Sequence, residues 1–122
     1  MEYTEELYDG QVNLLGQYHG LGRNLYAAGS IYEGQYSMGY WEGYGRHIKN
    51  DGDVYEGYWK EDNKHGWGRL YKATEGTTYE GYFLFGKGKH GHGLLRDKNG
   101  NILKEGIWDK GRYVGPSNKE LP

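Results

Sequence analysis

Histidine is the residue type whose spacing first suggests metal chemistry in this chain. Of five histidines, His19, His65 and His90 each precede a glycine at matching positions. Zinc needs its ligands about 2 Å from one centre, whereas matching positions in successive strand pairs lie about 10 Å apart. His90 and His92 could share a strand face, which supplies only two ligands. We therefore expect the three matching histidines to make hydrogen bonds near turns, and we predict no metal site.

A glycine motif near residue 86 has the spacing of a nucleotide-binding loop. Residues 86–91 read Gly-Lys-Gly-Lys-His-Gly, which matches G-x-G-x-x-G, and Gly81 to Lys87 has the spacing of a P-loop. The first motif needs a strand before it and a helix after it, but no helical apolar spacing follows. The second needs Ser or Thr where Gly88 stands. We predict no nucleotide binding and no cofactor.

Polar residues that could support catalysis show no converging pattern. Ser30, Ser37 and Ser117 lie at predicted junctions or in the tail, and nothing in the sequence places His or Asp beside them. Acids and arginines recur with a fixed period instead: Glu33, Glu56, Glu80 and Glu105, and Arg23, Arg46 and Arg69. We interpret them as a charge ladder across neighbouring strands, the alternative being a row that meets acidic partners. The chain is predicted not to be an enzyme.

One segment is locally basic and could contact phosphate groups. It contains Lys87, Lys89, Arg96 and Lys98. Each basic residue near an anionic surface contributes about 1 kcal/mol, so four make a weak lipid anchor. The chain as a whole has a net charge of -2 and a pI of about 6.2, so no overall field attracts nucleic acid. We predict no nucleic-acid partner and keep a weak contact with anionic lipid as an alternative.

Glycine provides the elements that would position these residues, because the 23 glycines recur with a fixed period. One signal is Tyr8-Asp9-Gly10, Tyr32-Glu33-Gly34, Tyr55-Glu56-Gly57 and Tyr79-Glu80-Gly81, with a variant copy at Lys104-Glu105-Gly106. A second signal in phase is Gly20-Leu21-Gly22, Gly43-Tyr44-Gly45, Gly66-Trp67-Gly68 and Gly91-His92-Gly93. Steps of 23 to 25 residues indicate an array of structural repeats. Arrays of this kind build extended surfaces for partners.

Each unit is predicted to be a strand, a turn and a second strand. Residues 55–59 alternate with period two, so Tyr55, Gly57 and Trp59 share one face. Ala28-Gly29, Asp51-Gly52 and Asn99-Gly100 have the composition of two-residue turns with positive φ. The chain holds 14 Tyr and 4 Trp, and rings lying over strand glycines would stabilise a thin sheet. We predict an all-β fold: an elongated, twisted, nearly single-layer antiparallel sheet of consecutive β-hairpins.

The repeated pattern resembles the MORN repeat (membrane occupation and recognition nexus). The closest unit combines Tyr55-Glu56-Gly57-Tyr58-Trp59 with Asn63-Lys64-His65-Gly66-Trp67-Gly68. The resemblance covers residues 8–115, in units near 8–31, 32–54, 55–78 and 79–103 and a degenerate fifth over 104–115. An acidic segment, 1–7, precedes the array, and a tail, 116–122, follows it.

This resemblance implies a non-catalytic protein–protein interaction scaffold or adaptor. MORN arrays occur in ciliary, axonemal and cytoskeletal proteins, so the implied place is a small subunit of such an assembly. The acidic start and the lack of a long apolar run predict a cytoplasmic protein. The alternative is a peripheral membrane adaptor that uses the basic segment.

The predicted partner site is an aromatic face shared by the repeats. It comprises Tyr32, Tyr55, Trp59, Tyr79, Phe83 and Trp108. Exposed Tyr and Trp are typical binding anchors, so a partner helix or an extended peptide would lie along them. The competing interpretation is that these rings are buried between the units.

Overall fold

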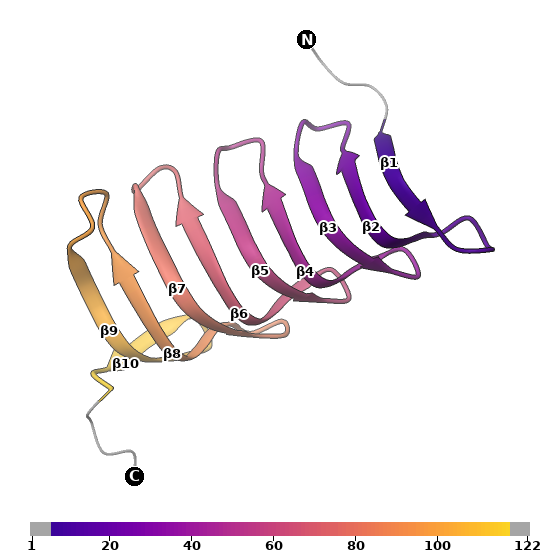
Figure 1. Cartoon of the computed structure of the whole chain (residues 1–122). Helices are drawn as coiled ribbons and strands as arrows, with labels where there is room; N and C mark the ends of the chain where they lie inside the picture. Colours follow the sequence, from indigo (N-terminus) through magenta and orange to yellow (C-terminus); the bar gives the residue numbers. More distant parts are fainter. Residues whose placement is uncertain (1–5, 118–122) are drawn as a thin grey trace.

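A computed structural model describes residues 6–117, which form ten β-strands joined by short turns (Figure 1). The strands are β1 (Leu7–Val12), β2 (Tyr18–Leu25), β3 (Ile31–Ser37), β4 (Tyr40–Ile48), β5 (Val54–Lys60), β6 (Asn63–Lys72), β7 (Thr77–Leu84), β8 (Gly88–Arg96), β9 (Ile102–Asp109) and β10 (Arg112–Gly115). Residues 1–5 and 118–122, and with them most of the predicted end segments, lie outside the described range.

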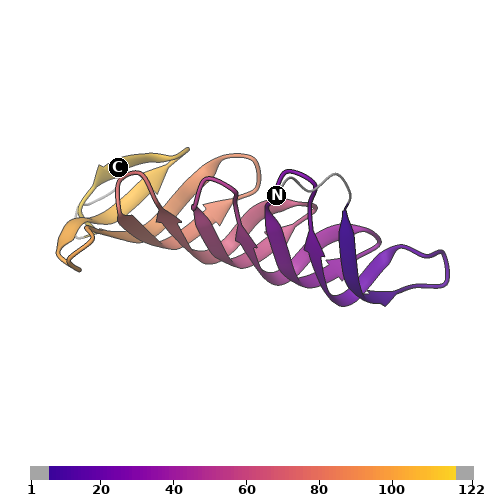
Figure 2. The same cartoon turned by 90° about the horizontal axis from the view of Figure 1, so that it is seen from above.

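The strands form one open antiparallel sheet in sequence order, β1 to β10. The described residues contain no helix, and thus none that could cross a membrane. Each predicted unit holds one strand pair, from β1–β2 to β9–β10. Figures 1 and 2 show a long, twisted ribbon in which every strand lies beside its sequence neighbours. The predicted fold class is confirmed.

The strands bend sharply, and one face of the sheet becomes the inside of the bend. Four residues along a straight strand span about 13 Å. The rings of Tyr55 and Trp59, four residues apart on β5, have centroids only 4.8 Å apart. Those of Tyr79 and Phe83 on β7 are 5.2 Å apart. The bend therefore closes these rings on one another. We call this side the inner face and the opposite side the outer face.

Glycine pairs make the bend possible. Gly57 on β5 lies directly opposite Gly68 on β6, and the Tyr55 ring covers both. A Cβ built on Gly68 would lie 2.5 Å from Cζ of Tyr55, so any other residue there would displace that ring. The predicted covering of strand glycines by aromatic rings is confirmed.

The first glycine of each Gly-x-Gly signal has a different role. Gly20, Gly43, Gly66 and Gly91 have φ between 79° and 96°. Each lies where the register of its hairpin shifts. On β6, for example, Gly66 lies between Lys64 and Gly68, which pair with Trp59 and Gly57 on β5. Positive φ is costly for residues with a Cβ, which explains glycine there. The Gly-x-Gly signal thus joins an irregular, left-handed residue to a ring-covered one.

The turns between units differ from the prediction. Lys49 N donates to Asp53 O and Gly52 N to Lys49 O, which closes a three-residue loop over 50–52. Only its glycine has positive φ, 96°, as in a type I turn followed by a left-handed residue. The two-residue turns lie inside the units instead, and one of them, Glu61-Asp62, contains no glycine although both residues have positive φ. The sequence predicted two-residue turns at the edge between units, whereas the structure has three-residue loops there and two-residue turns at the opposite edge.

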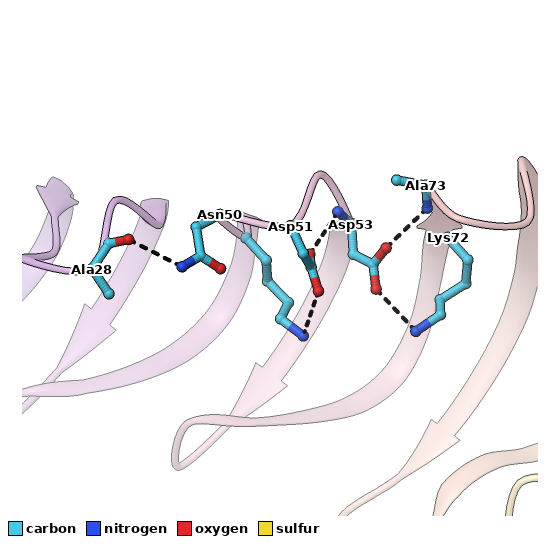
Figure 3. Close-up of polar contacts among 7 residues, drawn as sticks. Ala28, Asn50, Asp51, Asp53, Lys72 and Ala73 are labelled. Carbon is cyan, nitrogen blue, oxygen red and sulfur yellow. Dashed lines mark hydrogen bonds and ion pairs between the residues drawn. The ribbon is translucent and has the colours of Figure 1, made fainter. Parts of the chain in front are cut away.

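Polar contacts connect successive loops along the edge that joins the units (Figure 3). The Asp53 carboxylate accepts a hydrogen bond from Ala73 N at 2.9 Å and pairs with Lys72 Nζ at 2.9 Å. Asn50 Nδ2 donates to Ala28 O at 3.1 Å. The Lys72 ammonium and the Ala73 amide hold the pKa of the buried Asp53 carboxyl below its ordinary value. These contacts join the first three of the loops between units to one another.

Candidate functional site

The six aromatic residues predicted to meet a partner are core residues. Tyr32, Tyr55, Trp59, Tyr79, Phe83 and Trp108 are each at most 5% exposed. The reason is the bend of the strands, which presses the rings together on the inner face; Tyr79 and Trp108, for example, have centroids 5.1 Å apart. The competing interpretation, burial between units, describes them correctly, and they offer no surface to a partner.

Hydrogen bonds fix the tyrosines of this core. The hydroxyls of Tyr32, Tyr55 and Tyr79 each donate to the backbone carbonyl three residues further along, at 2.7, 2.9 and 3.0 Å. Burial raises the pKa of Tyr32 and Tyr55 far above the ordinary value and that of Tyr79 to about 12. These hydroxyls stay protonated near neutral pH. They act as structural donors and not as acid–base groups.

A second row of side chains covers the core tyrosines, and its chemistry changes along the ribbon. Tyr18 stacks on Tyr8 at 3.6 Å and Trp41 on Tyr32 at 4.4 Å. At the matching positions of the next two units, lysines take over. Lys64 Nζ lies 5.4 Å from the Tyr55 ring centre, and Lys89 Nζ lies 5.1 Å from that of Tyr79. This lid row is therefore aromatic in the first two units and cationic in the next two.

The lysine lids border a hollow of about 360 Å³ on the inner face. Leu70 and Phe83 line it together with Lys64 and Lys89. Burial lowers the pKa of both lysines from the ordinary value, and neighbouring lysines add to this effect. The hollow thus combines apolar walls with two partly desolvated ammonium groups.

The predicted lipid patch is not one cluster. Lys87 lies in the turn before β8 and Lys98 in the turn after it, so they sit at opposite edges of the ribbon. Lys89 turns inward over Tyr79, and the Arg96 guanidinium donates to Gly100 O at 3.1 Å. The four basic residues close in sequence are spread along a whole strand, so a flat anionic surface would meet only part of them.

The outer face carries a row of exposed aromatic residues, which we call the outer stripe: Tyr44, Tyr58, Trp67 and Tyr82. Each is between 41% and 51% exposed. Tyr44 lies directly opposite Tyr58, and Trp67 directly opposite Tyr82. Our sequence interpretation missed this stripe. The signal was present in two repeat positions. The middle residue of Gly-x-Gly is aromatic in the second and third units, and the residue after Tyr-Glu-Gly is aromatic in the third and fourth.

The charged residues beside the outer stripe form the expected ladder. Glu33, Arg46, Glu56, Arg69 and Glu80 lie opposite one another on successive strands. Arg69 reaches Glu80 at 3.2 Å and Arg46 reaches Glu33 at 4.0 Å. The Tyr44 hydroxyl donates to Glu56 at 2.8 Å. Leu94 stands at the next arginine position and interrupts the ladder between Glu80 and Glu105.

Two hollows lie on either side of Trp67 along the outer stripe. The first, about 220 Å³, is lined by Tyr44, Glu56, Trp67 and Arg69. The second, about 320 Å³, includes Trp67, Tyr82, Leu94 and the two glutamates, Glu80 and Glu105. The Trp67 ring therefore forms a wall shared by two successive depressions.

The histidines connect successive hairpins. His19 Nδ1 accepts a hydrogen bond from Met38 N at 3.1 Å, and His65 Nδ1 accepts one from Phe85 N at 3.0 Å. Glu42 takes the same position in the second unit and accepts from Glu61 N at 2.8 Å. His90 approaches Asp109 at 3.5 Å. Hydrogen bonds near turns were expected of all three matching histidines. The expectation is confirmed for His19 and His65 and wrong for His90, whose Nδ1 has no hydrogen-bond partner among the described residues.

A wide, open groove of about 900 Å³ crosses β1 to β6 beside these side chains. Its walls include His19, Glu42 and His65, whose acceptors already bind the next turn. Within residues 6–117, no three His, Asp or Glu side chains gather closely enough to hold a metal ion. The outer stripe, by contrast, is a row of exposed aromatic side chains on four successive strands, β4 to β7.

Known proteins give no direct guide to this surface. A comparison with protein-family models finds no match to the chain. A comparison with curated proteins also finds none.

Proposed function

We propose that this chain is a non-catalytic interaction scaffold of the MORN type that docks a protein partner on its outer stripe. The observation that carries the proposal is the row of half-exposed Tyr44, Tyr58, Trp67 and Tyr82 on a sheet whose core is already complete. Exposed Tyr and Trp supply large contact areas at small cost in side-chain entropy.

The array suits a scaffold because its repeats place equivalent residues at regular intervals. The ten strands lie in sequence order, and polar contacts join one unit to the next. An extended partner can therefore contact several units at once. The MORN resemblance supports a place in a cytoskeletal, ciliary or other large assembly. The membrane alternative has less support, because Lys87 and Lys98 lie at opposite edges of the ribbon.

Affinity purification of the tagged chain from its native cells, followed by quantitative mass spectrometry, tests the proposal. The wild type is compared with Tyr58→Ser/Trp67→Ser, which removes two rings of the outer stripe. A matched control, Leu14→Ser/Leu15→Ser, removes two apolar side chains from an exposed turn. We expect a fixed set of proteins that the stripe variant loses and the control retains. Recovery of the same proteins with both variants would contradict docking on the stripe.

A further inference from the structure

The repeat distance of the outer stripe selects one kind of partner backbone. Tyr44 and Trp67 occupy the same position in neighbouring units, two strands apart, or about 9.6 Å. A polyproline II helix presents the same face every three residues, or about 9.3 Å. Two turns of an α-helix advance about 10.8 Å. A β-strand presents the same face at every second residue, so its side chains on that face recur at about 7 and 13 Å. Of these three backbone periods, only that of polyproline II stays close to the distance between neighbouring units.

The shape of the stripe suits the same backbone. Planar rings of Tyr44, Trp67 and Tyr82 bound the two hollows, and grooves between aromatic rings are where proline-rich segments dock. Trp41 and Trp59 donate their indole N–H groups to Tyr26 and to Gly45 O. Trp67 makes no such bond within residues 6–117. Its N–H is available to a carbonyl of a polyproline II chain, which has no internal hydrogen bonds.

The charge of the second hollow indicates a basic side chain at one end of the partner. Glu80 and Glu105 flank Leu94 where the ladder would otherwise have an arginine. Arg69 neutralises Glu80 at 3.2 Å, and Glu105 has no ion pair among the described residues. One carboxylate beside an apolar floor and the Trp67 ring can therefore accept an arginine or lysine from outside.

We infer that the outer stripe binds a proline-rich segment in the polyproline II conformation. The segment lies along the ribbon with residues in both hollows beside Trp67 and a basic side chain against Glu105. This inference rests on the proposed function, because it names the partner of the same surface.

Fluorescence polarisation with labelled synthetic peptides tests this inference on the full chain. The probe is Arg-Pro-Pro-Ser-Pro-Pro-Ser-Pro-Pro-Ser-Arg. One control replaces every proline with glycine, and another replaces both arginines with serine. We expect the probe to bind at least about tenfold more tightly than the glycine peptide, because only the probe is preorganised. Equal binding of these two peptides would show charge attraction alone and overturn the inference.

Two variants locate the peptide. Trp67→Ala is expected to weaken probe binding about tenfold or more, as for a central aromatic anchor. Leu94→Arg completes the ladder and is expected to weaken the arginine-flanked probe while leaving the serine-flanked peptide unchanged. Leu21→Ala, which alters an exposed outer residue of the first unit, is expected to change neither peptide. Circular dichroism melting confirms that each variant is folded.

Probe binding that is insensitive to both Trp67→Ala and Leu94→Arg would place the peptide elsewhere and overturn the inference. If the probe fails to bind while the purified partner is still lost from Tyr58→Ser/Trp67→Ser, the scaffold proposal stands and the polyproline inference fails. If the probe fails and the stripe variant retains every partner, both fail.

Discussion

The inner and outer faces of the ribbon both carry periodic Tyr and Trp residues, yet their environments are opposite. Trp59 on the inner face is 5% exposed, whereas Trp67 on the outer face is 41% exposed. The two lie on adjacent strands of one sheet, β5 and β6. The direction of the strand bend separates them, because rings inside the bend converge and rings outside it diverge. An aromatic period therefore does not by itself identify a binding surface.

The largest expected effect comes from removing an inner ring. Trp59→Ser or Tyr79→Ser is expected to lower the free energy of unfolding by about 3–5 kcal/mol, as for other large-to-small core changes. Trp59 also loses its hydrogen bond to Gly45 O, at 3.0 Å. Urea unfolding followed by circular dichroism measures the change. An unaltered midpoint would mean that the inner rings are not the core, and it would reopen their role in binding.

The next effect tests the glycine that lies beneath a ring. Gly68→Ala is expected to cost about 1–3 kcal/mol, because its Cβ would overlap the Tyr55 ring and force it outward. Gly100→Ala is the control: its space is open, and only the positive φ of 87° is strained. That strain costs about 1 kcal/mol. Thermal melting of both variants should therefore rank Gly68→Ala as the more destabilised.

Exchanging the two kinds of lid tests the difference along the inner face. Trp41→Lys removes the stack on Tyr32 and the hydrogen bond that Trp41 donates to Tyr26, so we expect a loss of about 1–2 kcal/mol. Lys64→Trp puts an aromatic lid at the matching position over Tyr55 and is expected to fill part of the hollow of about 360 Å³. Paired urea titrations compare them. An unchanged urea midpoint in both variants would show that the lids contribute little to stability.

A pH-dependent effect is expected from His47, which lies on the inner face. Burial lowers its pKa from 6.5, and Lys64 and Lys49 add to this. The unfolded chain then binds a proton more readily than the folded one. Stability should accordingly fall as pH drops through about 6.5 and level off below the folded pKa.

His47→Leu is the matched variant, because Leu70 and Leu95 occupy the same position in later units. It should flatten the dependence of the urea midpoint on pH between about pH 5 and 7.5. A wild-type midpoint that rises as the solution becomes more acidic would contradict the assigned sign.

The smallest effect on stability is expected on the outer face. Tyr58→Ser and Trp67→Ser should each change the free energy of unfolding by no more than about 0.5 kcal/mol, as is usual for exposed residues. Differential scanning calorimetry measures this against Trp59→Ser. A large loss from Trp67→Ser would remove the contrast between the faces and weaken the case for a docking surface.

Much of the fold followed from local pattern. The alternation of Tyr55, Gly57 and Trp59 placed these residues on one face, and the recurring Gly-x-Gly signals located the strand pairs. The arginines and glutamates were expected to form a ladder, and Arg69 and Glu80 do so at 3.2 Å. These features depend on the residues within one strand and its immediate neighbours.

The candidate site did not follow from the sequence in the same way. Tyr55 and Tyr58 both lie on β5, and strand alternation places them on opposite faces of the sheet. Alternation does not say which of the two faces is buried. The basic residues 87–98 look like one cluster in sequence, but β8 holds its two ends apart. The turn at Glu61-Asp62 takes positive φ without glycine because the hairpin around it requires that geometry.

The sequence by itself determined a periodic all-β array of hairpins, because strand alternation and glycine placement are local properties of the chain. Only the tertiary structure decided that the inner rings are the core and that Tyr44, Tyr58, Trp67 and Tyr82 face outward. The physical reason is curvature: a thin sheet has two equivalent faces until its strands bend, and the bend buries one row of rings while it exposes the other.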